Sequence, residues 1–389
     1  MDGRSDAEKD RVSADASAPP AGPPDLGALL AYAIERRASD LHLKVPARPI
    51  VRVHGDLEQV PGGRPLSAAD TARFAEELLA DNDSRRAEFE TAGETDLSHS
   101  RDGLGRFRVN IFRQRGSISI VMRVVPFKVL SIEDLQLPPA VTQLADEERG
   151  IILVTGTTGS GKSTTLAAMI DRINRSAHKH VVTIEDPIEL LHVDRGSLIN
   201  QREVGLDTDS FASALRRVLR QDPDVIMIGE IRDLVTMETA LSAAETGHLV
   251  LSTMHTLDAT ETVNRAIGFF PLHQQQQVRA MLAGTLKGII SQRLVRTADG
   301  EGRVPACEIL VTTGRARDMI LNHEETGRLN EVIREGEYYG MQTFDQSLFD
   351  HVVAGRVPLA AALEAASSPH DFKLMLDAGA ARREAAQYS

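Results

Sequence analysis

Several residue types that mark particular protein classes are scarce in this chain. It has one cysteine, Cys307, and no tryptophan in 389 residues. A single cysteine excludes a disulfide framework and a zinc site built from cysteines. No apolar run approaches the ~18–20 residues of a membrane-spanning helix. The N-terminus, Met-Asp-Gly-Arg-Ser-Asp, does not have the pattern of a signal peptide. We therefore expect a cytoplasmic protein.

Positive charge is in deficit as well. The formal net charge is −12, which argues against nucleic acid as the main partner. The shares of hydrophobic and charged residues, 42% and 26%, are ordinary for a globular protein. A chain of 389 residues is long enough for two or three domains, each with its own core.

The first third of the chain changes character twice. Residues 1–24 are rich in Asp, Ala, Ser and Pro without periodicity, which predicts a disordered tail. Residues 25–125 combine helical spacing with alternating segments, and two alternating runs meet at a turn, Arg115-Gly116. They predict a small α+β domain. Three prolines in residues 126–139 indicate a linker.

Residues 140–389 predict a second, larger domain of the α/β class. Apolar runs at 151–155, 180–184, 225–228 and 249–254 alternate with helical stretches. This order is typical of a mostly parallel sheet covered by helices. Ligands bind beyond the carboxyl ends of such strands. After about residue 260 the pattern predicts a largely helical C-terminal part.

The most informative motif follows the first of these runs. It reads G-x-x-x-x-G-K-S between a buried strand and a helix, the context of a phosphate-binding P-loop. The glycines let backbone N–H groups turn toward a polyphosphate, and the helix N-terminus adds unpaired donors. The alternative is a glycine-rich turn that matches by chance. The predicted nucleotide-binding residues are Gly156, Thr157, Thr158, Gly159, Ser160, Gly161, Lys162, Ser163 and Thr164.

Acidic residues follow two other runs of the predicted sheet. Glu230 comes two residues after the run at 225–228, and we predict that it activates the attacking water. Since Gly229 fills the usual aspartate position, another carboxylate must help with Mg2+. The candidates are Glu185, Asp186 and Glu189. The predicted metal ligands are Ser163, Glu189 and Glu230; the alternative is that the acids are surface or capping charges.

Histidines and arginines offer further candidates. His248 and His255 flank the run at 249–254, and seven residues apart on a regular strand they point to opposite faces. They are nucleotide sensors or, alternatively, satisfied core or interface residues. P-loop enzymes often take an arginine from an adjoining domain or subunit. The first domain supplies Arg106, Arg108, Arg113, Arg115 and Arg123, for which solvated strand positions are the default interpretation.

These motifs, in their order, resemble those of a known family. GTTGSGKSTTLAAMI, TIEDPIE, NQREVGLDTDSF, LRQDPDVIMIGEIRD and AETGHLVLSTMHT are similar to motifs of the type II/type IV pilus secretion ATPases. The similarity is strongest to the twitching-motility PilT/PilU branch, the type IV pilus retraction ATPases. SDLHL, GRFRVN, GMQTFDQSL and DFKLMLD extend it from about residue 26 to 376.

The resemblance implies a RecA-like P-loop ATPase domain preceded by a smaller PAS-like α+β domain, assembled as a homohexamer. It implies ATP and Mg2+ as cofactors, Glu230 as the Walker B glutamate, Glu189 as the Asp-box acid and His248 and His255 as the His-box pair. It places arginines that reach the nucleotide at Arg108 and Arg123. The implied partners are an inner-membrane pilus platform protein and a paralogous motor ATPase, at the inner face of the cell membrane.

The sequence also departs from this family. Thr157 stands where the family usually has proline, and residues 315–322 keep only part of the motif AIRNLIRE. The chain could therefore retract pili alone or act as a PilU-like accessory motor. A pilus-extension or type II secretion ATPase is an alternative, although such enzymes usually carry a larger N-terminal region and a four-cysteine zinc site. A non-hydrolysing nucleotide-binding scaffold would not need Glu230, and a nucleic-acid translocase fits the acidic charge poorly.

Overall fold

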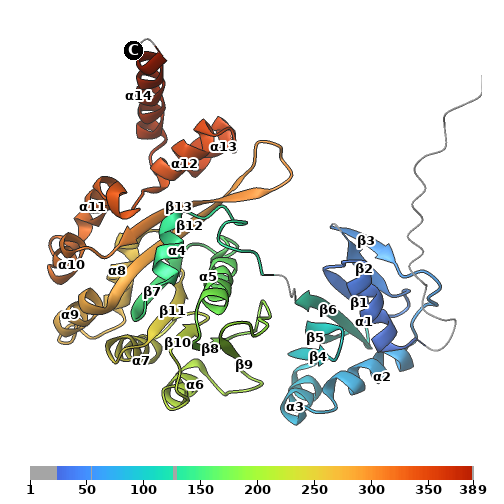
Figure 1. Cartoon of the computed structure of the whole chain (residues 1–389). Coiled ribbons are helices and arrows are strands. Elements are labelled where there is room, and N and C mark those ends of the chain that lie inside the picture. The colour runs from blue at the N-terminus through green and yellow to red at the C-terminus, as the bar shows by residue number, and fades with distance from the viewer. Residues whose placement is uncertain (1–23, 54, 126–128, 388–389) are drawn as a thin grey trace, which may run out of the picture. The chain divides into compact units, whose positions relative to one another are not determined.

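The structure is a computed structural model that describes residues 24–53, 55–125 and 129–387. The chain divides into two compact units with the boundary between residues 126 and 127 (Figure 1). The tail predicted at residues 1–24 lies outside the described residues, apart from Pro24. The exact domain limits, 25–125, 126–139 and 140–389, stay predictions.

The first unit contains a six-stranded antiparallel sheet in the order β3-β2-β1-β6-β5-β4. Alternate strand residues are buried, as Phe107, Val109 and Ile111 show on β5, and they form one core with the helices. Arg108, between them, is exposed on the other face. The elements are α1 (Leu26–Glu35), β1 (Asp40–Leu43), β2 (Ile50–Val53), β3 (Asp56–Gln59), α2 (Ala68–Leu79), α3 (Asp83–Ala92), β4 (Glu94–Arg101), β5 (Gly105–Gln114) and β6 (Ser117–Val125).

The turn between β5 and β6 lies where the sequence predicts it. Arg115 and Gly116 both have positive φ, 49° and 76°, which is the requirement of a tight hairpin turn whose twist matches the strands. Strands β3 and β4 and helix α3 were not predicted. β4 reads Glu-Thr-Asp-Leu-Ser-His-Ser-Arg, and so few apolar residues give little alternation to detect.

The second unit is built on a seven-stranded sheet in the order β13-β12-β7-β11-β10-β8-β9. All neighbours are parallel except β13, which pairs antiparallel with β12. Central strands are buried on both faces, as expected for parallel strands between helices. The strands are β7 (Gly150–Thr155), β8 (His180–Glu185), β9 (Leu198–Glu203), β10 (Val225–Ile228), β11 (Leu249–Met254), β12 (Leu286–Arg296) and β13 (Arg303–Val311).

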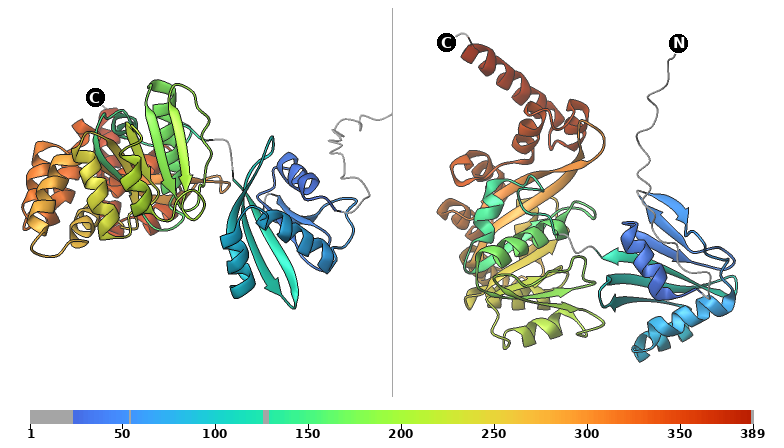
Figure 2. Two further views of the ribbon diagram at one scale, coloured as in Figure 1. Left: turned by 90° about the horizontal axis from the view of Figure 1, so that it is seen from below. Right: turned by 45° about the vertical axis from the view of Figure 1, so that its right-hand side comes forward.

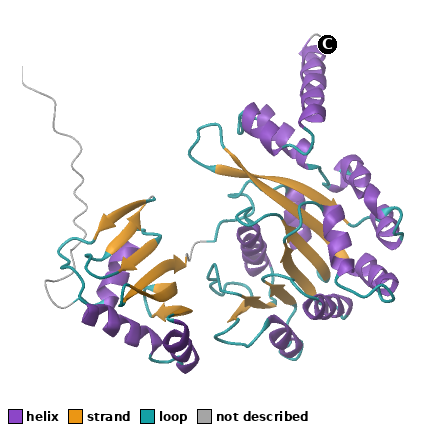
Figure 3. Cartoon of the chain, turned by 180° about the vertical axis from the view of Figure 1, so that it is seen from behind, coloured by secondary structure: helices purple, strands orange, loops and turns teal. Residues whose placement is uncertain are grey.

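Helices cover both faces of this sheet (Figure 3). On β7, Ile152 and Val154 pack with α4 and α5, whereas Ile151 and Leu153 pack with the helices of the other face. The helices are α4 (Pro139–Ala145), α5 (Lys162–Ser176), α6 (Phe211–Val218), α7 (Leu234–Glu245), α8 (Ala259–Gly268), α9 (Gln275–Thr285), α10 (Gly314–Leu321), α11 (Leu329–Glu335), α12 (Phe344–Val353), α13 (Leu359–Ala365), α14 (Pro369–Gln387) and the short 3-10 turns η1 (Thr326–Arg328) and η2 (Glu337–Tyr339).

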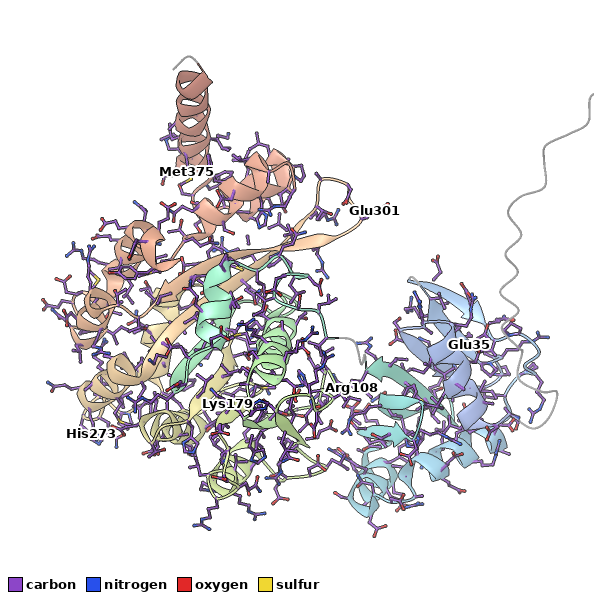
Figure 4. All side chains as sticks on the ribbon, viewed as in Figure 1. Glu35, Arg108, Lys179, His273, Glu301 and Met375 are labelled. Carbon is purple, nitrogen blue, oxygen red and sulfur yellow. The ribbon has the colours of Figure 1, made fainter. Side chains whose placement is uncertain are left out.

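The prediction of a largely helical chain beyond residue 260 is wrong for residues 286–311. These residues form β12 and β13, a long hairpin whose tip carries Glu301 (Figure 4). Most residues of both strands are buried on both sides, so the sequence shows no alternation that would distinguish them from a buried helix. The helical prediction holds for α10 to α14, and α14 extends away from this unit (Figure 2).

The segment predicted as a linker is partly integrated into the second unit. Ile132 and Leu137 are 3% and 8% exposed and pack in the core that includes α5. Helix α4 then begins at Pro139, a residue that favours the first turn of a helix. Among the described residues, no helix has both the length and the apolar character required to cross a membrane.

Candidate functional site

The candidate site lies at the carboxyl edge of the second sheet. Strands β7, β11, β10 and β8 are neighbours and parallel, so their carboxyl ends meet at one edge. The P-loop follows β7, His255 follows β11 by one residue, Glu230 follows β10 by two, and Glu185 ends β8. Chain segments far apart in sequence therefore converge here.

The P-loop backbone requires glycine at its first position. Gly156 has φ 141°, a conformation essentially restricted to glycine. A Cβ there would lie 2.5 Å from the carbonyl oxygen of Gln292 on β12 and 2.5 Å from the Ser160 Oγ. Gly159 and Gly161 also have positive φ, 80° and 93°. The loop is thus held tightly against the neighbouring strand.

Helix α5 presents an uncapped N-terminus to this loop. Its N-cap residue is Gly161, which has no side chain to satisfy the first N–H groups. Such an end is a ready-made anion site. The buried Ser160 Oγ has no hydrogen-bond partner among the described residues. Both features are suited to phosphate oxygens as acceptors.

Lys162 is the cation of the loop. It is 9% exposed, and its Nζ donates to the carbonyl oxygens of Gly156 and Thr157 at 2.9 and 3.0 Å. Burial lowers the pKa of the Lys162 ammonium, while the charges of Glu230 and Glu189 act in the opposite direction. The ammonium therefore lies within electrostatic reach of both predicted carboxylates.

Glu230 is held by the side chains of an arginine and a histidine. The Arg232 Nη2 lies 2.7 Å from its Oε2, and the His255 Nε2 lies 3.1 Å from its Oε1. Burial by itself raises the pKa of Glu230, but the hydrogen bond from Arg232 and the charges of His255 and Arg232 outweigh burial and lower it. The carboxylate is consequently ionised at neutral pH.

Glu185 has the opposite character. It is 8% exposed and accepts hydrogen bonds from Thr183 Oγ1 at 2.7 Å and Gln201 Nε2 at 3.1 Å. Burial raises its pKa in spite of these bonds. Two carboxyl groups in environments that shift their pKa values in opposite directions are a recurring feature of acid–base sites.

A cavity of about 520 Å³ joins these groups. It lies at the mouth of the P-loop and is also bordered by Arg232 and Arg303. A second cavity of about 790 Å³ adjoins it and shares Gly161, Thr164, Leu294 and Arg303. The predicted site residues that line the first cavity are Thr158, Gly159, Gly161, Lys162, Ser163, Thr164, Glu189, Glu230 and His255.

His248 is not brought to this cavity. It precedes β11, and its Nδ1 lies 3.0 Å from the carbonyl oxygen of Ala243. His255 is seven residues further along the chain, on the other side of β11, which puts it roughly 23 Å away at ~3.3 Å per residue. Because the two histidines stand at opposite ends of one strand, the structure does not support a shared role within one chain.

The predicted arginines belong to the first unit. Arg108 on β5 pairs with Arg123 on β6 in the strand register, and both are exposed (Figure 4 labels Arg108). Arg123 Nε donates to Asp40 Oδ1 at 2.9 Å. They therefore share one face of the sheet, and their role at a nucleotide stays a prediction.

Sequence reasoning missed Arg232 and Arg303 as cavity residues. Arg232 stands two positions after Glu230 in the same strand-end loop, and that spacing was a usable signal. Arg303 begins β13, a strand that was not predicted, so nothing in the sequence marked it.

The residues present fit Mg2+ held together with a nucleotide. Among the described residues, no cluster of three or more His, Cys, Asp or Glu side chains could form a complete protein cage for a metal. Mg2+ usually takes one or two carboxylates, water and substrate phosphates instead. Ser163, Glu189 and Glu230 all line the cavity at the P-loop and supply the oxygen donors that such a site uses.

A parallel sheet with helices on both faces, a P-loop after a central strand and a carboxylate after the strand two places away define a RecA-like P-loop ATPase domain. Comparisons with known proteins agree. The family described as Type II/IV secretion system protein matches residues 23–331. This chain belongs to that family.

Its relatives include pilus motors. The type IV pilus retraction ATPase PilT of Pseudomonas aeruginosa is 42% identical over 90% of this chain and 100% of its own length. The type IV pilus ATPase PilU of the same organism is 40% identical over 90% of this chain and 91% of its own length. A crystal structure of the pilus retraction motor PilT with bound ADP has a TM-score of 0.79 at 44% identity, covering 87% of this chain and 96% of that one.

These similarities confirm two predictions made from the sequence. One is the resemblance to the PilT/PilU branch. The other is the fold class, a RecA-like α/β ATPase domain preceded by a smaller α+β domain.

Proposed function

We propose that this chain is an Mg2+-dependent ATP hydrolase that works as a homohexamer to power type IV pilus retraction and twitching motility. The observation that carries the proposal is the convergence of Lys162 and Glu230 on one cavity at the P-loop. The similarity to PilT over the whole length of that protein supports the biological output. A non-hydrolysing scaffold would have no use for the paired, ionised Glu230.

The residues of the cavity divide the chemistry among them. The loop N–H groups and the Lys162 ammonium would bind the β- and γ-phosphates. Bound Mg2+ would neutralise the charge that develops on the transferred phosphoryl group. Glu230 would orient the attacking water and accept its proton, and His255 would hold the Glu230 carboxylate in place through Oε1.

The second cavity suits the nucleoside part of ATP. It adjoins the phosphate cavity at Gly161 and Thr164, and its walls include Leu130, Leu135 and Leu294. Largely apolar walls with a few polar groups are typical of nucleoside and other small-molecule pockets.

The proposed setting is the cytoplasmic face of the inner membrane. There the ring would act on a membrane platform protein, and a paralogous ATPase would be a further partner; nucleic acid would not. Because PilU is nearly as similar as PilT, an accessory motor role is the second candidate.

Two experiments test this proposal. The purified chain should hydrolyse ATP with Mg2+ and lose turnover in EDTA, and Lys162→Ala should lose it by a factor on the order of 10²–10³. Lys287→Ala is the matched control, since Lys287 pairs with Glu147 instead of lining the cavity. A wild-type protein without hydrolysis would refute the enzymatic part.

Deletion of the gene followed by imaging of surface pili tests the output. Retraction predicts long fibres that do not shorten, whereas pilus extension predicts bald cells. If retraction stops only when a paralogue is deleted as well, the accessory role is correct.

A further inference from the structure

Arg232 contacts Glu230 in a way that the hydrolytic reaction does not require. Its Nη2 is 2.7 Å from Glu230 Oε2, while His255 occupies Oε1. Both oxygens of the carboxylate are therefore paired with cationic or potentially cationic groups. The Arg232 side chain is nevertheless 68% exposed, in contrast to 18% for Glu230.

This contact conflicts with metal binding at the same carboxylate. A hydrated divalent cation near Glu230 would meet the guanidinium charge within a few ångströms, and like charges at such distances repel. The pair must weaken before Mg2+ and nucleotide settle. Because the Arg232 guanidinium is largely in solvent, its ion pair is close to the exposed kind that contributes little, and Arg232 can be displaced at small cost.

A second carboxylate is available to receive Arg232. Asp186 lines the same cavity, and its charge acts on the Arg232 guanidinium in addition to that of Glu230. Arg232 is thus within electrostatic reach of two acidic groups, and the metal needs one of them, Glu230. Lys162 is in a similar situation, because its ammonium is already hydrogen-bonded to carbonyl oxygens of its own loop and must exchange them for phosphate oxygens.

We propose that Arg232 is a latch that holds Glu230 in the nucleotide-free protein and competes with Mg2+–nucleotide for its carboxylate. Arg232 is in this view a positioning residue that acts through Glu230. The inference rests on the proposed function, because it assumes that Glu230 serves the metal and the attacking water.

The test is equilibrium binding of a fluorescent ADP analogue to the full-length protein, with Mg2+ and with EDTA. Removing the competitor in Arg232→Ala should tighten binding about two- to fivefold in Mg2+ and should not tighten it in EDTA. Arg232→Lys, which keeps the charge, should bind like wild type. In steady-state turnover Arg232→Ala should show a lower KM for Mg2+–ATP than wild type.

A double-mutant cycle identifies the route of the effect. In the Glu230→Gln protein there is no carboxylate for which Arg232 and Mg2+ can compete, so adding Arg232→Ala should leave the nucleotide affinity in Mg2+ unchanged. Tightening that persists in this background or in EDTA would overturn the latch. Weaker or unchanged binding in Arg232→Ala would overturn it too, and weaker binding would make Arg232 a phosphate-binding residue.

Two controls separate this result from other failures. Equal melting temperatures of the variants without nucleotide exclude a folding defect. If the wild-type protein hydrolyses ATP but Arg232→Ala does not bind the ADP analogue more tightly, only the latch is refuted. If the wild-type protein neither binds nor hydrolyses nucleotide, the proposed function is refuted.

Discussion

Glu230 shows how much of this site depends on the surroundings of one side chain. Burial in the cavity opposes its charge, and Arg232 and His255 restore it. A carboxylate that remains ionised at neutral pH can accept a proton and attract a hydrated metal. A neutral amide of the same shape can do neither.

We therefore expect Glu230→Gln to bind nucleotide and lose hydrolysis by a factor on the order of 10²–10⁴, the usual contribution of a general base. Steady-state turnover and binding of a fluorescent nucleotide check both halves of the prediction. Glu238→Gln, an exposed glutamate on α7, is the control and should retain full activity. Turnover of Glu230→Gln at the wild-type rate would show that another group activates the water.

At the scale of single elements, helix α8 depends on a buried acid. The N–H of its first residue, Ala259, donates to Glu308 Oε1 at 2.9 Å. Glu308 is 3% exposed, and its pKa is raised to about 7, chiefly by burial; the charges of Asp258 and Asp345 contribute to this rise, and the backbone bond and Arg293 oppose it. The first N–H of α8 is thus bonded to a buried carboxyl group whose neutral form burial favours, in addition to the N-cap Asp258.

The pKa shift of Glu308 predicts a dependence of stability on pH. Between about pH 4.5, the ordinary pKa, and pH 7 the folded state binds more protons than the unfolded state. Stability from this group therefore falls as pH rises through that window, by up to about 3 kcal/mol. Glu308→Gln keeps the acceptor oxygen without the charge.

The variant Glu308→Gln should accordingly melt at a higher temperature than wild type at pH 8, and the difference should shrink toward pH 5. Thermal unfolding of both proteins at the two pH values measures it. A stabilisation of equal size at both pH values would mean that Glu308 does not titrate in this window.

The P-loop tolerates little change at its first glycine. Gly156→Ala would place a Cβ against two atoms of the fold and also require a strained backbone. We expect a loss of at least about 2 kcal/mol in stability. Gly300→Ala, also at positive φ but with open space around the Cβ, should lose only about 1 kcal/mol. Comparable melting temperatures for the two variants would contradict the tight contact with β12.

On the scale of the whole molecule, the chain consists of two compact units. The first unit carries exposed arginines on one sheet face, with Arg123 paired to Asp40. The second carries the cavity. An arginine supplied by a neighbouring subunit would couple ATP turnover to assembly.

Mixing inactive subunits tests that coupling. Arg123→Ala and Lys162→Ala should each be inactive alone, because one lacks the arginine and the other the phosphate-binding cation. Random mixing in equal amounts should restore roughly a quarter of wild-type turnover. Each site then has an even chance of an intact Lys162 from one subunit and an even chance of an intact Arg123 from the neighbouring subunit. Arg113→Ala, whose guanidinium lies over the ring of Phe89, should stay active. No recovery in the mixture would place Arg123 outside a shared site.

The sequence by itself determined the α/β class, the P-loop and the carboxylate after β10, because motif spacing and apolar runs are local properties of the chain. It did not reveal β12 and β13, whose burial on both faces removes the alternation that marks a strand. Only the tertiary structure decided that His255, and not His248, lines the cavity and that Arg232 holds Glu230. Which side chains reach the cavity depends on the order of the strands in the sheet and on the direction in which each loop turns. Neither property can be predicted from one segment of the sequence.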